Sequence, residues 1–242
     1  MPEKWSKPDL AEVRVAIEET LADLESERQE VLSVSNESTP GARLVRYEYW
    51  GTLSATRKRL AEVEFLAGRA EWRSILRDAL ADLSKGLDTG AKGDHWVLGQ
   101  YVVLRAVLGE SSEGDWQFEK AWQAAQLGLD NVDPRERMWA HSSIADLLMV
   151  GQAEGLPKIA HERPLDVLAE LKVMVEVGGG PARCEAVWPT FRQFWRWRYW
   201  WKNEKWAVEA QRGFDYLWAI VRPRFEREIT QAQAASTTAR GA

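Results

Sequence analysis

The 242-residue chain predicts an all-α fold of about nine helices. Apolar residues recur at spacings of three and four, which places them on one face of a helix, whereas the period-two alternation of strands is nearly absent. Short segments rich in Gly, Pro, Ser and Asp separate the apolar runs. Helices joined by such short turns build bundles or helical solenoids.

The N-terminal segment, residues 1–36, predicts an acidic amphipathic helix. Eight acidic residues and two arginines between Asp9 and Glu30 give this stretch a net charge of −6. The apolar residues of the segment share one helical face: Leu10, Val13, Ile17, Leu21 and Leu24. We therefore expect this helix to bury one side and to expose an acidic surface on the others.

Residues 37–177 predict a domain of successive helices. Thr39 followed by Pro40 is typical of an N-cap with a proline in the first helical turn. Gly68 and Gly109 are placed to end two of these helices. The helices are expected over residues 41–67, 72–87, 96–108, 115–129, 133–151 and 164–177.

Residues 181–230 predict a Trp-rich helical pair that continues the same array, and residues 231–242 predict a disordered tail. Six of the fourteen tryptophans lie between Trp188 and Trp206, interleaved with five basic residues. On a helical wheel two apolar stripes fall on opposite sides, and Pro189 fits the first turn. One stripe contains Trp188, Trp195, Tyr199 and Trp206, and the other contains Phe194, Trp197 and Trp201.

This Trp-rich segment has three possible interpretations. Two opposed stripes favour a helix that is packed on both flanks, and they count against a helix lying on a membrane surface. The segment could also bind a protein partner, because Trp, Tyr and Arg anchor interfaces. A third possibility is a nucleic acid that stacks on residues 188–206. The predicted partner-binding residues are Arg192, Arg196, Trp197, Arg198, Trp200, Trp201 and Lys202.

Composition and charge restrict the class of protein. A net charge of −5 and a pI near 5.5 argue against a general binder of polyanions. The single cysteine, Cys184, cannot form an internal disulfide and indicates a reducing compartment. There is no apolar signal sequence and no stretch of roughly 20 apolar residues, so we expect a cytoplasmic protein without a membrane span.

The sequence contains no catalytic or metal-binding motif. His95, His141 and His161 are not spaced as metal ligands, and the glycines of residues 178–181 are not followed by the Gly-Lys-Ser/Thr of a phosphate-binding loop. We therefore expect a protein that is not an enzyme and that carries no cofactor and no metal.

Two stretches resemble the helix–turn–helix units of tetratricopeptide repeats, residues 96–134 and 194–223. More narrowly, residues 95–109, 122–126 and 137–148 are similar to the TRAF-binding-type modules of apoptosis signal-regulating kinases and of bacterial caspase-like effector systems. The resemblance implies a right-handed helical stack that acts as an adaptor or scaffold, in signalling or in a bacterial defence system. The expected function is capture of a partner peptide or helix on an aromatic and Arg-lined surface, with nucleic-acid association as the alternative.

Overall fold

The computed structural model confirms the all-α prediction. It describes residues 7–34, 39–89, 95–110, 116–154, 166–180 and 184–240. Within these ranges the chain forms nine α-helices and one π-helical turn, without any strand. The chain divides into two compact units, Met1–Ala124 and Ala125–Ala242. This division differs from the predicted one, in which residues 37–177 form a single domain.

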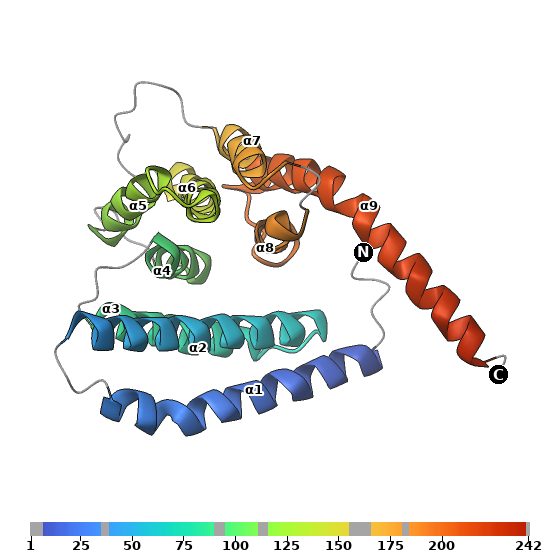
Figure 1. Ribbon diagram of the computed structural model, residues 1–242, viewed down its shortest axis with the longest axis horizontal. Coiled ribbons are helices and arrows are strands. Elements are labelled where there is room, and N and C mark those ends of the chain that lie inside the picture. The colour runs from blue at the N-terminus through green and yellow to red at the C-terminus, as the bar shows by residue number, and fades with distance from the viewer. Residues whose placement is uncertain are drawn as a thin grey trace. The chain divides into compact units, whose positions relative to one another are not determined.

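The first unit consists of helices that pack against their neighbours in sequence. These are α1 (Lys7–Val34), α2 (Pro40–Leu66), α3 (Trp72–Leu87) and α4 (His95–Leu108). Helix α2 packs against both α1 and α3, and α3 packs against α4 (Figure 1). Helix α5 (Trp116–Leu129) carries the boundary between the two units.

The predicted caps in the first unit are confirmed. The amide of Ala42 donates a hydrogen bond of 3.2 Å to the Thr39 hydroxyl, and Pro40 occupies the first turn of α2. Gly68 and Gly109 follow the ends of α2 and α4 with φ values of 73° and 74°. This left-handed conformation is the one that glycine adopts without steric cost.

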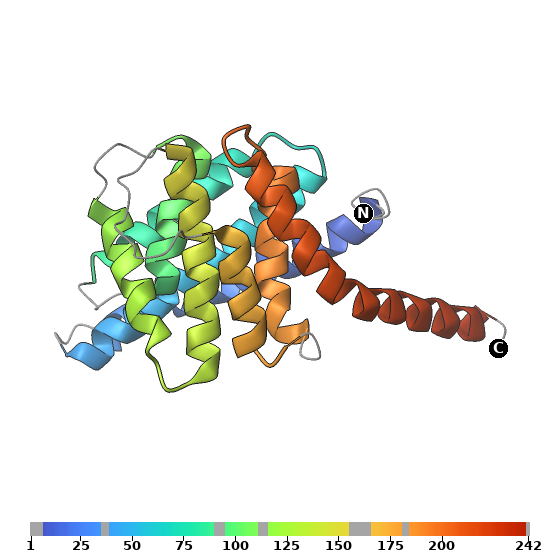
Figure 2. The ribbon, with the colours of Figure 1, turned by 90° about the horizontal axis from the view of Figure 1, so that it is seen from above.

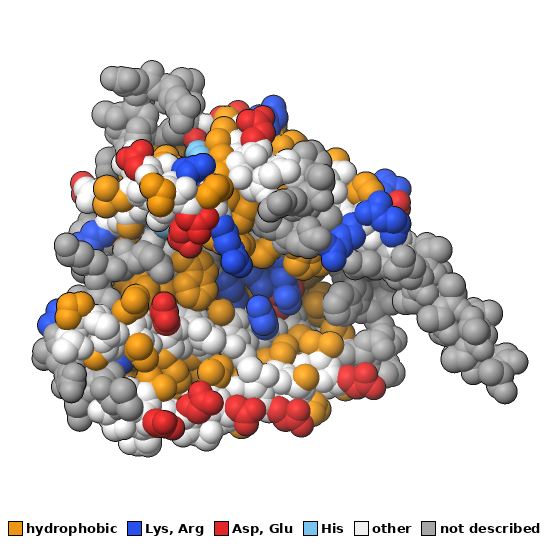
Figure 3. Space-filling view, in the orientation of Figure 1, with side chains coloured by type: hydrophobic (Ala, Val, Ile, Leu, Met, Phe, Trp, Pro, Cys, Tyr) orange, Lys and Arg blue, Asp and Glu red, His pale blue; other side chains and the backbone are white. Residues whose placement is uncertain are grey.

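Helix α1 buries most of the predicted stripe. Leu10 and Leu21 are buried, and Ile17 and Leu24 are partly buried. Val13 is the exception, because it is exposed. Acidic side chains follow the outer side of the helix, along the lower edge of Figure 3. The prediction of an amphipathic acidic helix is therefore confirmed with a narrower apolar face.

The second unit contains α6 (Pro134–Glu154), α7 (Val167–Val177), α8 (Cys184–Trp195), the π-helical turn η3 (Arg196–Trp200) and α9 (Ala207–Arg240). Helix α7 packs against α6 and α9, and α9 also contacts α8 and η3 (Figure 2). The Asp133 carboxylate caps α6 by accepting a hydrogen bond of 2.8 Å from the amide of Arg135. The glycine turn after α7 is also present, with positive φ at Gly179 and Gly180.

Several predicted boundaries in the second unit differ from the structure. Helix α7 begins after an Asp166 N-cap, and Pro164 lies outside the described residues. Pro189 lies inside α8 instead of in its first turn, because the helix already begins at Cys184. The second helix of the predicted Trp-rich pair, α9, begins at Ala207.

The C-terminal end of α9 also differs from the prediction. The backbone remains helical through Pro223 and as far as Arg240, where a disordered tail was expected from residue 231. Proline removes one backbone hydrogen bond but does not always end a helix, and Figure 2 shows α9 bending part-way along its length. The alanine and glutamine residues of the final stretch are favourable helix formers. Across the described residues, no helix combines the length and apolar character needed to cross a membrane.

Candidate partner-binding site

The Trp-rich segment is not the single helix that the wheel assumed. Helix α8 ends at Trp195, and the backbone widens into the π-helical turn η3. The amide of Trp201 donates a hydrogen bond of 2.7 Å to the carbonyl of Arg196, five residues earlier, as in a π-helix. Residues 201–206 then form a turn before α9 begins. Aromatic residues beyond position 195 therefore do not follow the spacing of an α-helix.

Three tryptophans from this turn form a buried cluster, which we call the buried Trp cluster: Trp197, Trp201 and Trp206. The Trp197 ring lies 5.4 Å from that of Trp201 and 4.9 Å from that of Trp206, both in edge-to-face geometry. The Trp197 indole N–H donates to Asp146 Oδ1 at 2.8 Å, and the Trp206 indole N–H donates to the Trp201 carbonyl at 2.8 Å. These bonds satisfy the buried indole N–H groups of Trp197 and Trp206, whereas Trp201 is positioned by its ring contact with Trp197 and by its carbonyl.

A buried polar network lies between α6, α7 and α8. Nδ1 of His141 lies 2.7 Å from Glu170 Oε2, and the hydroxyls of Ser142 and Thr190 lie 2.8 Å apart. Sequence reasoning did not identify these pairs. The available signal was the presence of His141, Ser142 and Asp146 on a helix that is otherwise almost wholly apolar from residue 138 to residue 150. Buried hydrogen-bonded polar groups of this kind fix how helices pack.

The seven predicted partner-binding residues do not share one surface. Arg192 and Arg198 are half-buried and Lys202 is exposed, whereas the other four residues are buried: Arg196, Trp197, Trp200 and Trp201. Buried side chains can contact a partner only after local opening, so burial assigns these four to the interior of the folded protein. Binding through Arg192, Arg198 and Lys202 stays a prediction.

A second set of aromatic residues lies at the surface of α8, η3 and α9. We call it the aromatic face, and it consists of Trp188, Trp195, Tyr199, Trp218 and Phe225, which are all half-buried or exposed. Three of these residues belong to the first of the two predicted stripes. Trp206, the fourth member of that stripe, is buried because the chain has left the helix before it.

Ring contacts join three residues of the aromatic face, Trp188, Trp218 and Phe225, across α8 and α9. The Trp188 ring is stacked on Phe225 at 6.4 Å, and Trp218 meets Phe225 edge-on at 5.9 Å. Beneath them the buried Phe191 lies 5.6 Å from Trp218 in a stacked arrangement. At the other end Trp195 and Tyr199 lie 6.0 Å apart.

The two helices approach closely enough to exclude a side chain at one position. A Cβ atom added to Gly213 of α9 would lie 2.3 Å from Cε1 of Phe194 on α8. Glycine at this position therefore allows the α8–α9 contact that brings the aromatic residues of both helices together.

Cationic side chains border the aromatic face. Arg192 lies on the same side of α8 as Trp188 and Trp195, because four and three residues separate them. The Arg198 guanidinium lies 5.1 Å from the centre of the Tyr199 ring and donates to the Gln211 side chain. Arg222 lies one turn from Trp218 and pairs with Glu226 at 2.6 Å. The border of the aromatic face thus contains three arginines, of which Arg222 is paired with an acidic residue, and Asp215 lies one turn before Trp218.

Comparison with known proteins identifies no relative. No family model matches the chain, and neither the curated proteins nor the solved structures include a significant match. The resemblance to tetratricopeptide and TRAF-binding-type modules therefore rests on the sequence patterns alone and stays a prediction.

Proposed function

We propose that the protein is a non-enzymatic interaction module that holds an apolar, acidic helix or peptide of a partner protein against the aromatic face. The observation that carries the proposal is the row of half-exposed aromatic rings across α8 and α9. Trp188 leaves 41% of its surface exposed. Several large aromatic side chains that lie together at a protein surface mark a binding site more often than a single exposed ring does.

The rigidity of the face supports the same function. Its rings rest on buried aromatic residues, Phe191 and Phe214, and the helices are held together at Gly213. A surface that is ordered before binding loses little conformational entropy when a partner docks. The aromatic residues can therefore act as preformed anchors.

The charge around the face indicates the chemistry of the partner. Arg192, Arg198 and Arg222 border the apolar surface. Basic residues at the rim of an interface favour an acidic partner and accelerate its association. An amphipathic helix with one apolar side and one acidic side would match both the aromatic rings and the arginines that border them.

A protein partner agrees better with this geometry than a nucleic acid does. A strand-binding surface needs exposed cations that follow exposed rings. In the segment 188–206, Arg196 is buried and Arg198 donates to Gln211. The exposed Lys202 follows the buried Trp201 and not a ring of the aromatic face.

The wider setting of this function follows the sequence resemblance. We propose a right-handed, tetratricopeptide-like stacking of the helices and a cytoplasmic adaptor role, in signalling or in a bacterial defence system. Consecutive packing of α1 to α4 is compatible with such a stack. Repeat arrays of this kind present extended surfaces to peptides and helices.

The proposal is tested by affinity capture from native lysate with three forms of the intact protein. The wild type is compared with the double variant Trp188→Ala/Trp218→Ala and with Trp96→Ala. Trp96 is a matched control because it is 40% exposed but belongs to the first unit. Each capture is performed at low and high salt, with and without nuclease, and read by mass spectrometry.

A discrete protein that is retained by the wild type and by Trp96→Ala, but is lost from the double variant, would support the proposal. Equal recovery of every protein by all three forms would contradict it. Recovery of nucleic acid alone, lost steeply as salt is raised, would instead favour the nucleic-acid alternative.

A further inference from the structure

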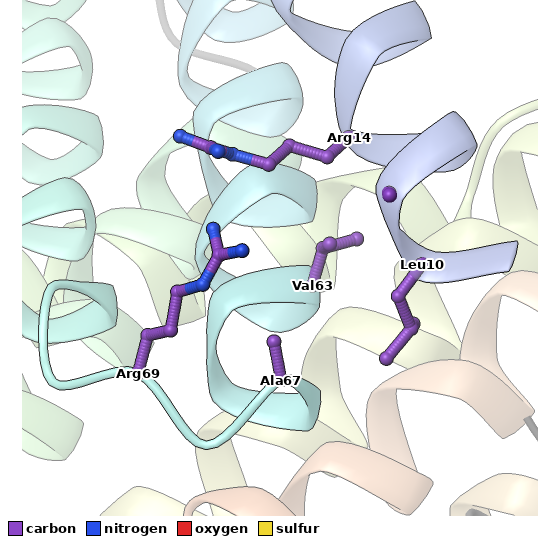
Figure 4. Close-up of a pocket in the computed structure, with 6 residues that line it drawn as sticks. Leu10, Arg14, Val63, Ala67 and Arg69 are labelled. Atoms are coloured by element: carbon purple, nitrogen blue, oxygen red, sulfur yellow. The ribbon is translucent and has the colours of Figure 1, made fainter. Parts of the chain in front are cut away.

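The first unit contains a cavity between α1, α2 and the turn that follows α2. It has a volume of about 230 Å³ and is lined by Leu10, Ala11, Arg14, Val63, Ala67 and Arg69. The lining therefore combines four apolar side chains with two guanidinium groups. Figure 4 shows Arg14 reaching from α1 and Arg69 from the turn toward the same part of α2, beside Leu10, Val63 and Ala67.

A single buried carboxylate holds both arginines in place. The Glu64 side chain is only 4% exposed, and its Oε1 lies 2.7 Å from Arg14 Nε. The Nη1 atom of Arg69 donates to the same carboxylate at 3.1 Å. The ion pairs with Glu64 bring both guanidiniums to the same end of the cavity before any ligand arrives.

The two arginines differ in the number of carboxylates with which they pair. Arg14 also pairs with the exposed Glu18 at 3.0 Å. Within the described residues, Glu64 is the one carboxylate that pairs with Arg69. Because a guanidinium carries five N–H donors in a planar fork, Arg69 retains donors that are not used by Glu64. Arg69 is therefore the stronger candidate to bind an anion in the cavity.

The size and the apolar lining indicate what accompanies the anion. An engineered apolar cavity of about 150 Å³ accepts a benzene molecule. The cavity here is larger, and Leu10, Val63 and Ala67 provide an apolar surface beside the guanidiniums. A phenyl ring or an aliphatic group of similar size fits these dimensions, and a carboxylate is the anion that matches the geometry of Arg.

We propose that this cavity is a binding site for a carboxylate attached to one apolar group of about the size of a phenyl ring. The carboxylate binds Arg69, with a contribution from Arg14, and the apolar group occupies the space between Leu10, Val63 and Ala67. Such a ligand is either a small organic acid or the C-terminal residue of a peptide, which presents the same two groups. The site belongs to the first unit and does not depend on the aromatic face of the second.

Isothermal titration of the intact protein with benzoate, benzyl alcohol and acetate tests the site. We expect benzoate to bind more tightly than benzyl alcohol, which lacks the charge, and than acetate, which lacks the ring. Arg69→Gln should weaken benzoate binding by about tenfold or more, because a charge-assisted hydrogen bond is lost. Arg77→Gln is the matched control, since Arg77 is exposed on α3 and does not line the cavity.

A second variant keeps the test decisive if Arg69→Gln unfolds the unit. Ala11→Phe fills the cavity from α1 without removing a charge, and it should abolish benzoate binding while circular dichroism remains unchanged. Benzoate binding that is equally strong in wild type and in Ala11→Phe would overturn the proposal, and so would the absence of binding by the wild type.

The source of the ligand is distinguished with N-acetylphenylalanine and its amide. Tight binding of the acid but not of the amide would support the site and assign it to a peptide C-terminus. Binding of benzoate without binding of N-acetylphenylalanine would support the site and assign it to a small organic acid.

Discussion

The buried Trp cluster and the aromatic face come from the same Trp-rich stretch, yet they have opposite environments. Trp197 is fully buried and its indole N–H bonds to Asp146, whereas Trp188 is 41% exposed and stacks on Phe225. The first tryptophan holds the second unit together and the second is available to a partner. A high density of tryptophan in a sequence therefore does not by itself identify a binding surface. Some of these residues are buried in the core, and others lie at the surface.

The largest effect is expected from truncation in the buried Trp cluster. Trp197→Ala should lower the free energy of unfolding by about 3–5 kcal/mol, through the cavity that it leaves. Trp195→Ala should cost only roughly 1 kcal/mol, because its ring is half-buried and loses less apolar contact. Chemical denaturation followed by circular dichroism measures both values. Equal losses for the two variants would remove the distinction between core and face.

A backbone substitution tests the contact that joins α8 and α9. Gly213→Ala should destabilise the protein by about 1–3 kcal/mol, since the new Cβ meets the Phe194 ring. Gly41→Ala is the control, because a Cβ at this position in α2 has open space around it. Gly41→Ala should leave the thermal midpoint unchanged or raise it slightly. A neutral Gly213→Ala would show that the two helices are not held as closely as described.

The hydrogen bond between Asp146 and Trp197 should contribute a similar amount, which is smaller than the effect of Trp197→Ala. Asp146→Ala leaves the buried indole N–H without this acceptor and should cost about 1–3 kcal/mol. Asp215→Ala removes an exposed aspartate that accepts from Gln211, and its effect should stay within about 0.5 kcal/mol. Urea denaturation of the two variants separates them, and similar stabilities would argue against a structural role for Asp146.

The smallest change in stability is expected on the aromatic face. Trp188→Ala should lower the free energy of unfolding by no more than about 1 kcal/mol, because the exposed ring loses little burial. The same variant should lose most of its affinity for the captured partner, as anchor residues at an interface do. Thermal unfolding and a binding titration on one preparation provide both results. A variant that unfolds readily but binds normally would reverse the roles assigned to the two regions.

The sequence predicted which segments form helices better than it predicted where each helix begins and ends. Local chemistry defines α2, where the Thr39 side chain and Pro40 form a cap that needs no tertiary contact. Pro189 was expected in the first turn of its helix but lies inside α8, and α9 continues through Pro223. Packing of the surrounding residues stabilises these helices enough to tolerate one missing hydrogen bond, and this contribution is not visible in local patterns.

The candidate site was predicted only in part. The wheel separated the half-buried or exposed Trp188 and Trp195 from the buried Phe194 correctly, because all three residues lie in the α-helical α8. It placed Trp206 with the first group, since the periodicity does not indicate the π-helical turn or the chain reversal at residues 201–206. Which stripe would be buried depended on partners such as Asp146, more than fifty residues away. Such contacts cannot be read from spacing within one helix.

Hydroxyl-radical footprinting of the intact protein tests the central distinction most directly. Mass spectrometry measures the oxidation rate of each tryptophan, and Trp96 serves as an internal reference because its exposed fraction of 40% nearly equals the 41% of Trp188. The structure predicts that Trp188 is oxidised at a rate similar to Trp96, whereas Trp197 and Trp201 are protected until the protein unfolds. Oxidation of Trp197 as fast as Trp188 in the folded protein would contradict the division into a buried Trp cluster and an aromatic face.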